Sequence, residues 1–318
     1  MRSFPPLPDL LASDPAADIL RGHLWLLELL CGTGLRFRMD DSGLLRFAGP
    51  ETAYAALEAA PLALRPAIRH VRARFDREAL RASVDEPATI VFFGVAPHHC
   101  GIGYDWERLP PFLGTDVWSA GSIDPKGPRE SLKPGETAET AGADVGSFRP
   151  PDAAAAIFDG VGLDPVNAVE RERNARDFAP DSYPIPDSAW YDGPAAGVVV
   201  RNKRGGRGRI VRDRLDSDQE AGGECAPAAH EPADTDDLEH LTARYVTPNR
   251  LARAAGSMER DGTPVTVGSL AERVVETVAR ETPVRVGDRH SDSSLDPDEL
   301  RTAALSPARA FLDDSGSR

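Results

Sequence analysis

Strand-forming runs occupy roughly the first two thirds of this 318-residue chain, and helical periodicity occupies the remainder. Residues 23–47 read as strands around the turn Asp40–Gly43, which predicts an antiparallel meander. Helices are predicted at residues 62–82, with arginines on an outer face, and at 150–158. Further strands are predicted at residues 88–94, 112–118, 195–203 and 208–212, the last two as a hairpin. Strands followed by helices predict an α+β fold with an antiparallel sheet.

Two weak regions divide the chain into parts. Residues 119–147 are rich in Gly, Pro, Glu, Thr, Ala and Asp and predict a disordered surface insertion. Residues 213–240 are acidic and read as a linker. Beyond it, residues 241–318 predict a small all-helical domain, with cap signals at Thr247-Pro248 and Asp296-Pro297.

The charge balance is strongly acidic. There are 51 acidic residues and only three lysines, Lys126, Lys133 and Lys203, and the net charge is −14. This pattern is typical of a halophilic protein, although GC-rich coding also replaces Lys by Arg, and both causes can contribute. An acidic chain does not coat nucleic acid or an anionic membrane with its whole surface, so any nucleic-acid contact must be local.

The three cysteines, Cys31, Cys100 and Cys225, are widely spaced and predict neither a disulfide framework nor a metal site. His98-His99-Cys100 places adjacent side chains on opposite sides of an extended segment, so we expect no metal there. The start of the chain does not resemble a signal peptide, and no apolar run is long enough for a membrane span. The sequence therefore predicts a reducing compartment, the cytoplasm.

No single catalytic signature is complete in this sequence: HExxH, GxSxG and GxxxxGK[ST] are all missing. Cys31-Gly-Thr-Gly34 is half of a nucleotide-binding motif and reads more simply as a hairpin turn with positive φ.

Five short segments nevertheless occur in an order typical of one family. They are Glu28-Leu29-Leu30-Cys31-Gly32 before Leu35-Arg-Phe37, Val91-Phe-Phe-Gly94-Val95, Thr115-Asp116, Ala196-Gly-Val-Val199, and Arg207-Gly-Arg-Ile210. Over residues 20 to 212 the chain resembles ATP-dependent RNA ligases of the covalent nucleotidyltransferase superfamily, and most closely a haloarchaeal, archaeal branch. The resemblance implies an antiparallel-sheet nucleotidyltransferase domain (ATP-grasp-like ligase adenylation domain) over residues 1–212, followed by the helical domain.

The same resemblance assigns chemistry to particular positions. In this family a lysine attacks the α-phosphate of ATP, and the AMP then passes to an RNA 5′-phosphate. Leu29 stands at the lysine position, and Val95 and Ala196 stand at two carboxylate positions, so ATP and Mg²⁺ are implied only if activity survives. The resemblance implies nucleotide contacts at Gly32, Arg46, Thr115 and Arg209.

Residues 201–214 form a basic, glycine-rich stretch in this acidic chain. It is either a solvated hairpin or an edge that contacts RNA phosphates, for which the candidates are Arg201, Lys203, Arg204 and Arg207. Three functions therefore remain open: a catalytically degenerate RNA-ligase-like protein (a pseudoenzyme) that binds RNA with 5′-phosphate ends, an active ligase with a non-standard site, or an interaction protein that keeps only the fold.

Overall fold

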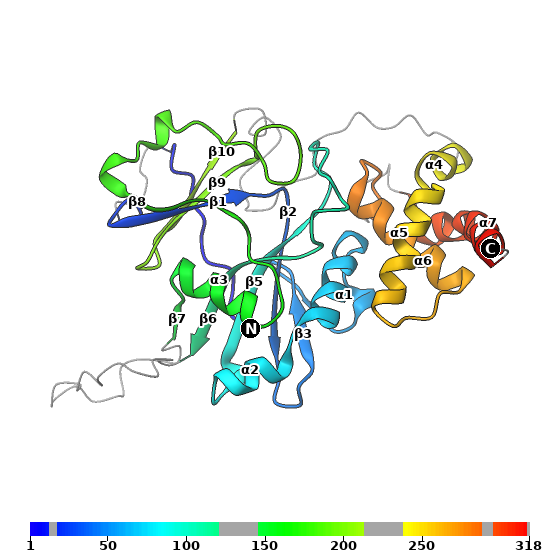
Figure 1. The fold of residues 1–318 in the computed structure, drawn as a ribbon, viewed down its shortest axis with the longest axis horizontal. Helices are drawn as coiled ribbons and strands as arrows, with labels where there is room; N and C mark the ends of the chain where they lie inside the picture. Colours follow the sequence, from blue (N-terminus) through cyan, green and yellow to red (C-terminus); the bar gives the residue numbers. More distant parts are fainter. Residues whose placement is uncertain (13–17, 121–145, 213–237, 288–294, 317–318) are drawn as a thin grey trace.

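A computed structural model describes residues 1–12, 18–120, 146–212, 238–287 and 295–316. Most of the predicted insertion at 119–147 and of the predicted linker at 213–240 therefore lies outside the described residues. The described part is a mixed structure of two antiparallel sheets followed by a C-terminal helical region, which confirms the predicted α+β class (Figure 1). None of its helices combines the length and the apolar character that a membrane span requires.

The first sheet, sheet A, combines strands from distant parts of the sequence. Its strand order is β10-β9-β1-β8, all antiparallel. The predicted hairpin is confirmed as β9 and β10. The bounds are β1 (His23–Leu29), β8 (Ala168–Asn174), β9 (Gly197–Asn202) and β10 (Arg207–Val211).

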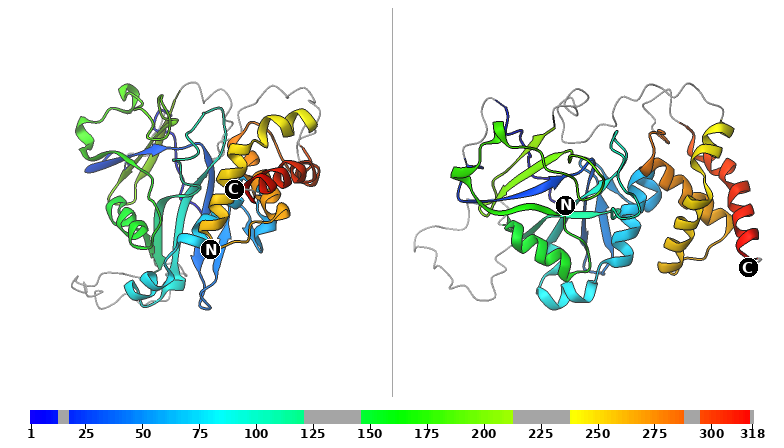
Figure 2. Two further views of the ribbon diagram at one scale, coloured as in Figure 1. Left: turned by 45° about the vertical axis from the view of Figure 1, so that its right-hand side comes forward. Right: turned by 45° about the horizontal axis from the view of Figure 1, so that its top comes forward.

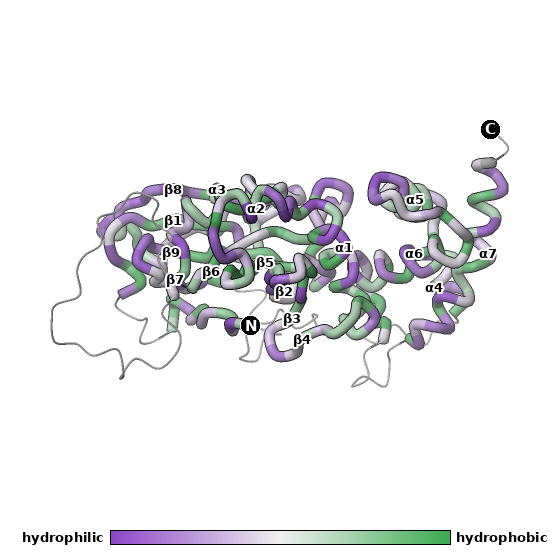
Figure 3. Tube along the Cα trace, turned by 90° about the horizontal axis from the view of Figure 1, so that it is seen from below, coloured by the Kyte–Doolittle hydropathy of each residue, from purple (hydrophilic) through white to green (hydrophobic). Residues whose placement is uncertain are grey.

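The second sheet, sheet B, has the order β4-β3-β2-β5-β6-β7. One face packs against the helices α1, α2 and α3 around an aromatic core that includes Phe37, Phe92 and Phe158. In Figure 3, α2 and α3 lie on one side of this sheet and the chain's first residue on the other. The bounds are β2 (Gly32–Met39), β3 (Leu45–Ala48), β4 (Ala53–Tyr54), β5 (Ile90–Pro97), β6 (Leu113–Ala120), β7 (Gly146–Phe148), α1 (Arg65–Arg74), α2 (Arg77–Ser83) and α3 (Pro151–Gly160).

The predicted meander over residues 23–47 is correct for β2 and β3 and wrong for β1. The chain crosses from sheet A to sheet B between Leu29 and Gly32, so the two strands never pair. The predicted turn at Cys31–Gly34 is also wrong, because Gly32 and Gly34 lie on β2 without positive φ. They are needed for close approach: a Cβ on Gly32 would lie 2.5 Å from the carbonyl oxygen of Ala96.

The single helix predicted over residues 62–82 is two helices. Phe75 takes an extended conformation after α1, and the side chain of Asp76 then accepts hydrogen bonds from the backbone N–H groups of Glu78 and Ala79, both at 2.9 Å. Asp76 is therefore an N-cap that starts α2. Short 3-10 turns accompany these elements at Leu57–Ala59, Leu62–Leu64, Pro87–Thr89, Ala175–Asp177 and Pro180–Ser182.

The C-terminal helices have a hydrophobic core of their own, which includes Leu251, Leu270, Val274 and Leu300. Both predicted cap signals are confirmed, since Thr247 caps one helix and Pro297 begins another. This region lies at one end of the molecule, beside α1 (Figure 2). Its helices are α4 (Leu238–Tyr245), α5 (Pro248–Arg260), α6 (Val267–Glu281) and α7 (Pro297–Gly316).

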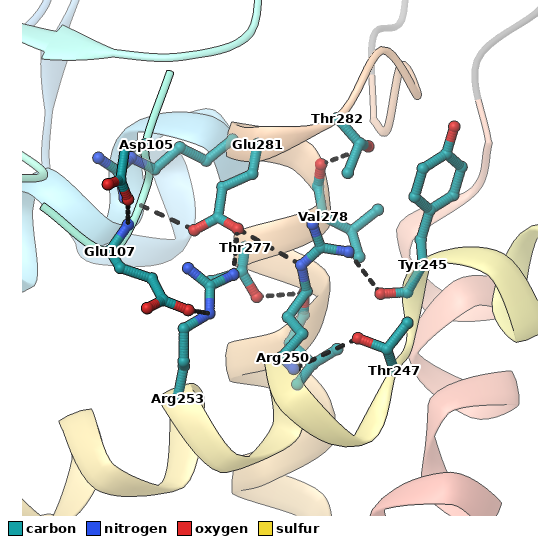
Figure 4. A network of polar contacts seen from close by, with 12 residues as sticks. Asp105, Glu107, Tyr245, Thr247, Arg250, Arg253, Thr277, Val278, Glu281 and Thr282 are labelled. Carbon is teal, nitrogen blue, oxygen red and sulfur yellow. Dashed lines mark hydrogen bonds and ion pairs between the residues drawn. The ribbon is translucent and has the colours of Figure 1, made fainter. Parts of the chain in front are cut away.

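Helix α6 joins the helical region to the sheets through buried ionic groups. Arg69 of α1 binds the carboxylate of Glu276, which is fully buried, at 2.9 Å. The buried guanidinium of Arg280 donates to the carbonyls of Pro97 and Leu109 at 3.1 and 3.0 Å. Close to it, Arg253 binds Glu281 at 2.6 Å, and Arg250 adds a longer contact to the same carboxylate (Figure 4). The arginine face predicted for residues 65–77 is thus partly an interface.

His70, on α1, predicts a pH dependence of stability. Burial lowers the pKa of its imidazole from 6.5 to about 4, with Arg74 and Arg280 acting in the same direction and Asp164 and Asp261 opposing them. Because the folded pKa lies below the unfolded one, the stability that the neutral ring contributes is complete above pH 6.5 and is lost as pH falls toward 4. His70→Gln has no imidazole to protonate. Between pH 7.5 and 4 we therefore expect its free energy of unfolding to fall by up to about 3 kcal/mol less than that of the unmodified chain.

The measurement is the free energy of unfolding in urea between pH 7.5 and 4, as a difference from the unmodified chain. His240 on α4 is exposed, so His240→Gln is the matched control and should leave the pH profile unchanged. Parallel profiles for the His70 variant and the unmodified chain contradict the prediction.

Candidate functional site

The two sheets are joined by one buried carboxylate. Asp116 lies on β6 of sheet B, and its Oδ1 binds Arg201 of β9 at 2.7 Å and Arg207 of β10 at 2.6 Å. Arg201 also donates to the carbonyls of Thr115 and Arg149 at 2.7 and 3.1 Å. All three charged side chains are buried, and burial lowers the pKa of Arg201. We call this set, Asp116 with Arg201 and Arg207, the inter-sheet ion cluster.

Strand register places further cations and aromatic rings beside this cluster. Arg36 pairs across β2 and β5 with Phe93, and Phe93 pairs with Asp116, so the three form one cross-strand row. The guanidinium of Arg207 lies 4.4 Å from the ring centroid of Phe148. Two buried guanidinium groups, those of Arg201 and Arg207, therefore share one carboxylate, and Arg36 lies two strands away in the same row, where it donates to the carbonyl of Pro50 at 3.1 Å. The junction between the sheets has excess positive charge in a protein whose net charge is −14.

Two arginines of this region have a side-chain N–H donor without a hydrogen-bond partner among the described residues. The Nε atoms of Arg36 and Arg209 are buried and make no hydrogen bond to any described group. Arg209 pairs with Val199 in sheet A, one row from the inter-sheet ion cluster. A buried N–H without a partner is costly, so these donors are available to an anion.

The three positions assigned to the ligase reaction come together, but in apolar surroundings. Leu29 at the end of β1, Val95 on β5 and Ala196 before β9 belong to one hydrophobic cluster. Its other members include Tyr104, Trp106, Trp190 and Tyr191. We call this the apolar cluster. The predicted motif order therefore identifies residues that are neighbours in space, and the side chains that meet there are not those of a charged site.

A disulfide between Cys31 and Cys100 lies in the apolar cluster, and its ends have a sequence separation of 69. The expectation of unpaired cysteines is wrong, because pairing of Gly32 with Pro97 brings Cys31 beside the segment that follows β5. The prediction of a reducing compartment therefore loses its basis in the cysteines. Cys225 lies outside the described residues.

The four predicted nucleotide contacts are separated. Gly32, on sheet B, follows Cys31 of the apolar cluster, and Arg209, on sheet A, pairs with Val199 of that cluster. Thr115 is half-buried and donates to the carbonyl of Phe93 at 3.3 Å. Arg46 is not part of the group: it lies on β3 opposite Arg38, exposed and bound to Asp40 at 2.8 Å. Arg46 also lines a surface pocket, which lies between β3, β4 and α1.

The predicted phosphate-contacting edge of the hairpin is smaller than expected. Arg201 and Arg207 are 2% and 6% exposed and are bound to Asp116, so they hold the sheets together and do not form an exposed edge. Lys203 and Arg204 are exposed. Lys203 binds Glu172 at 2.8 Å, and this hydrogen bond raises the pKa of the lysine. A raised pKa keeps the amine protonated, the opposite of what a nucleophile needs.

The residues at the apolar cluster do not fit Mg²⁺ with ATP. Mg²⁺ requires oxygen ligands, and Leu29, Val95 and Ala196 supply none from their side chains. Glu28 is buried next to Leu29, but its carboxylate accepts from the Ser188 hydroxyl and the Ala189 N–H. Among the described residues no group of three or more His, Cys, Asp and Glu side chains could hold a metal ion.

Comparison with known proteins gives structural neighbours only. No family model matches the sequence, and no curated protein does. Similar solved structures include RNA ligases. Two forms of an archaeal ATP-dependent RNA ligase are each 12% identical with TM-scores of 0.43, covering 98% and 100% of this chain and 66% and 67% of the ligase. A Naegleria gruberi RNA ligase mutant with ATP and Mn is 12% identical with a TM-score of 0.46, covering 69% of this chain and 59% of that one. The chain thus spans about two thirds of the archaeal ligase and less of the Naegleria enzyme.

Several residues of the junction were not predicted as site residues, namely Arg36, Asp116, Phe93 and Phe148. Arg36 offered one signal, since it stands between Leu35 and Phe37 in a strand whose other face is apolar. Phe93 and Asp116 lay in two of the five family segments but were given no role, because they become neighbours only when β5 pairs with β6, and Phe148 joins them only through β7.

Proposed function

We propose that this chain is a non-catalytic RNA-ligase-like protein that binds RNA with a 5′-phosphate and forms no lysine–AMP adduct. The observation that carries the proposal is the apolar cluster: Leu29, Val95 and Ala196 meet there, where the family's chemistry needs a lysine and two carboxylates. Lys203 is the only lysine among the described residues, and its amine is held by Glu172 and Asp152. Lys126 and Lys133 lie outside them.

The binding part of the proposal is supported by charge. The junction combines the excess positive charge of Arg36, Arg201 and Arg207 with the free Nε donor of Arg209. Guanidinium groups bind phosphate oxygens in a bidentate geometry, and they remain charged at any physiological pH. Exposed Arg204 on the β9–β10 turn extends the positive surface, whereas the charge of Lys203 is balanced by Glu172 and Asp152. Arg201 and Arg207 contribute only their field, because they are bound to Asp116, whereas Arg204 and the Nε of Arg209 can bind a 5′-phosphate without a metal.

The setting of the protein is part of the same proposal. We infer a salt-adapted, haloarchaeal origin from the acidic, lysine-poor composition, and a cytoplasmic location stays a prediction. High salt weakens phosphate contacts steeply, so a protein that binds RNA there needs a concentrated cationic site. The domain division into residues 1–212 and 241–318 also stays a prediction.

The binding claim is tested with a fluorescent single-stranded RNA oligonucleotide, titrated by anisotropy at several KCl concentrations. We expect binding that is stronger for the 5′-phosphorylated than for the 5′-hydroxyl RNA. Arg209→Ala should weaken it by about tenfold, since one charge-assisted phosphate contact is worth about 1–3 kcal/mol. Arg309 is an exposed arginine on α7, and Arg309→Ala is the matched control.

Two outcomes contradict this proposal. If neither RNA binds at any salt concentration, the protein keeps only the fold, and an interaction role is the better reading. If binding is unaffected by the 5′-phosphate and by Arg209→Ala, the RNA site lies elsewhere.

A further inference from the structure

Residues 1–11 cross the junction between the two sheets. On sheet B the ring of Phe4 packs edge-on against Phe93, with 5.2 Å between centroids. The guanidinium of Arg36 lies 5.4 Å from the centroid of the same ring. Gly34 leaves the space that the ring fills, since a Cβ there would lie 2.8 Å from Phe4. The ring of Phe4 thus rests on an aromatic side chain and against a cation.

The same segment then reaches the edge strand of sheet A. The N–H of Arg209 donates to the carbonyl of Pro8, and the N–H of Leu10 donates to the carbonyl of Arg209, both at 2.9 Å. Leu10 is 2% exposed and packs over Gly208, where a Cβ would lie 2.5 Å from its side chain. Residues 1–11 therefore lie against the side chain of Arg36 and the backbone of Arg209, two of the arginines whose Nε atoms have no partner among the described residues.

The attachment of this segment is light. Residues 1–9 are exposed or half-exposed, and Leu10 is the single buried side chain among residues 1–11. Two backbone hydrogen bonds hold the segment to β10, and prolines at 5, 6 and 8 remove three N–H donors that could add more. Elements with few buried contacts open at low free energy.

The surface beneath the segment has the chemistry of a single-strand site. Phe93, Trp118 and Phe148 form one aromatic group, and Arg36 and Arg207 lie next to it. Aromatic rings stack on any nucleobase and guanidinium groups bind the backbone phosphates, which is how single-stranded nucleic acid is held without sequence preference. Phe4 covers this surface with its ring edge-on to Phe93, in the space that a nucleobase would need to reach that side chain.

We propose that residues 1–11 compete with RNA for this surface, with Phe4 in the place of a nucleobase. The inference rests on the proposed function, because it names where the RNA of that proposal stacks. RNA binding requires the segment to leave Phe93 and β10, so the apparent affinity is reduced by the fraction of molecules in which the segment is docked. Removing the Phe4 ring lowers the docked fraction and leaves the arginines of the surface in place.

The experiment measures the affinity of a 5′-phosphorylated single-stranded RNA for the full chain and for Phe4→Ala. We expect the variant to bind about threefold to tenfold more tightly, because the competing segment is released. Leu44, on the β2–β3 turn, is 57% exposed, and Leu44→Ala is the matched control with unchanged affinity. Amide hydrogen exchange over residues 207–211 supplies a second readout: RNA should accelerate exchange at the Arg209 N–H, which loses its bond to Pro8.

The outcomes separate this inference from the proposed function. Unchanged affinity of Phe4→Ala, with unchanged exchange at Arg209 on RNA binding, overturns the competition while RNA binding stands. Binding by Phe4→Ala alone supports both. If neither protein binds RNA, the competition and the proposed function are both overturned.

Discussion

Asp116→Ala is expected to lower the free energy of unfolding by about 3–5 kcal/mol, because it leaves two buried guanidinium groups without their carboxylate. Arg201 and Arg207 lie 2.7 and 2.6 Å from the Asp116 Oδ1 and are 2% and 6% exposed. The substitution also removes the ion pairs that link sheet B to sheet A among the described residues of this junction. Asp116→Asn keeps a hydrogen-bond acceptor without the charge. Its free energy of unfolding should lie between those of the unmodified chain and Asp116→Ala. Urea unfolding at constant KCl measures the difference.

The matched control is Asp152→Ala. Asp152 also pairs with a cation, Lys203, at 3.4 Å, but its side chain is 46% exposed, and surface pairs contribute little. We therefore expect an unfolding midpoint close to that of the unmodified chain. If Asp116→Ala were no more destabilising than Asp152→Ala, the ion cluster would not be what joins the sheets.

The Cys31–Cys100 disulfide gives the second large effect. Its loss is expected to cost about 4 kcal/mol, since cross-linking a 69-residue separation removes chain entropy from the unfolded state. The double variant Cys31→Ser with Cys100→Ser should show this loss in urea unfolding, and addition of dithiothreitol to the unfolded chain before refolding should reproduce it. Cys225→Ser is the control and should respond to dithiothreitol as the unmodified chain does.

A thiol count decides whether the disulfide forms. The chain has three cysteines, so the denatured, unreduced protein should show one thiol that reacts with a chromogenic disulfide reagent, and the reduced protein three. Three reactive thiols before reduction would contradict the bond and restore the argument for a reducing compartment.

Local signals in the sequence predicted the elements well. The β9–β10 hairpin and the Thr247 cap of α5 follow from residues that are adjacent in the chain, where turn and cap chemistry act directly. The break between α1 and α2 depends on Asp76 acting as a cap, a signal that helical periodicity over residues 62–82 concealed. Periodicity reports which face is buried and does not show where a helix stops.

Strand partners were beyond local reasoning. β1 pairs with β8 and β9, so Leu27 lies beside Ala168 and Val199, and nothing near Leu27 in sequence indicates this. The Cys31–Cys100 bond and the row of Arg36, Phe93 and Asp116 follow from the same long-range register. The candidate site, too, was predictable only in part. Motif order placed Leu29, Val95 and Ala196 together, whereas the packing of Phe4 on Phe93 depends on tertiary structure alone.

The claim that the chain forms no lysine–AMP adduct is tested most directly with α-labelled ATP. The protein is incubated with it and Mg²⁺ in molar KCl and then denatured, beside an active RNA ligase as positive control. The apolar cluster around Leu29, with Val95 and Ala196 in place of carboxylates, predicts no label above background on this chain. Stoichiometric label that survives denaturation, mapped by mass spectrometry to Lys126, Lys133 or Lys203, would contradict the account and establish an active ligase with a different nucleophile.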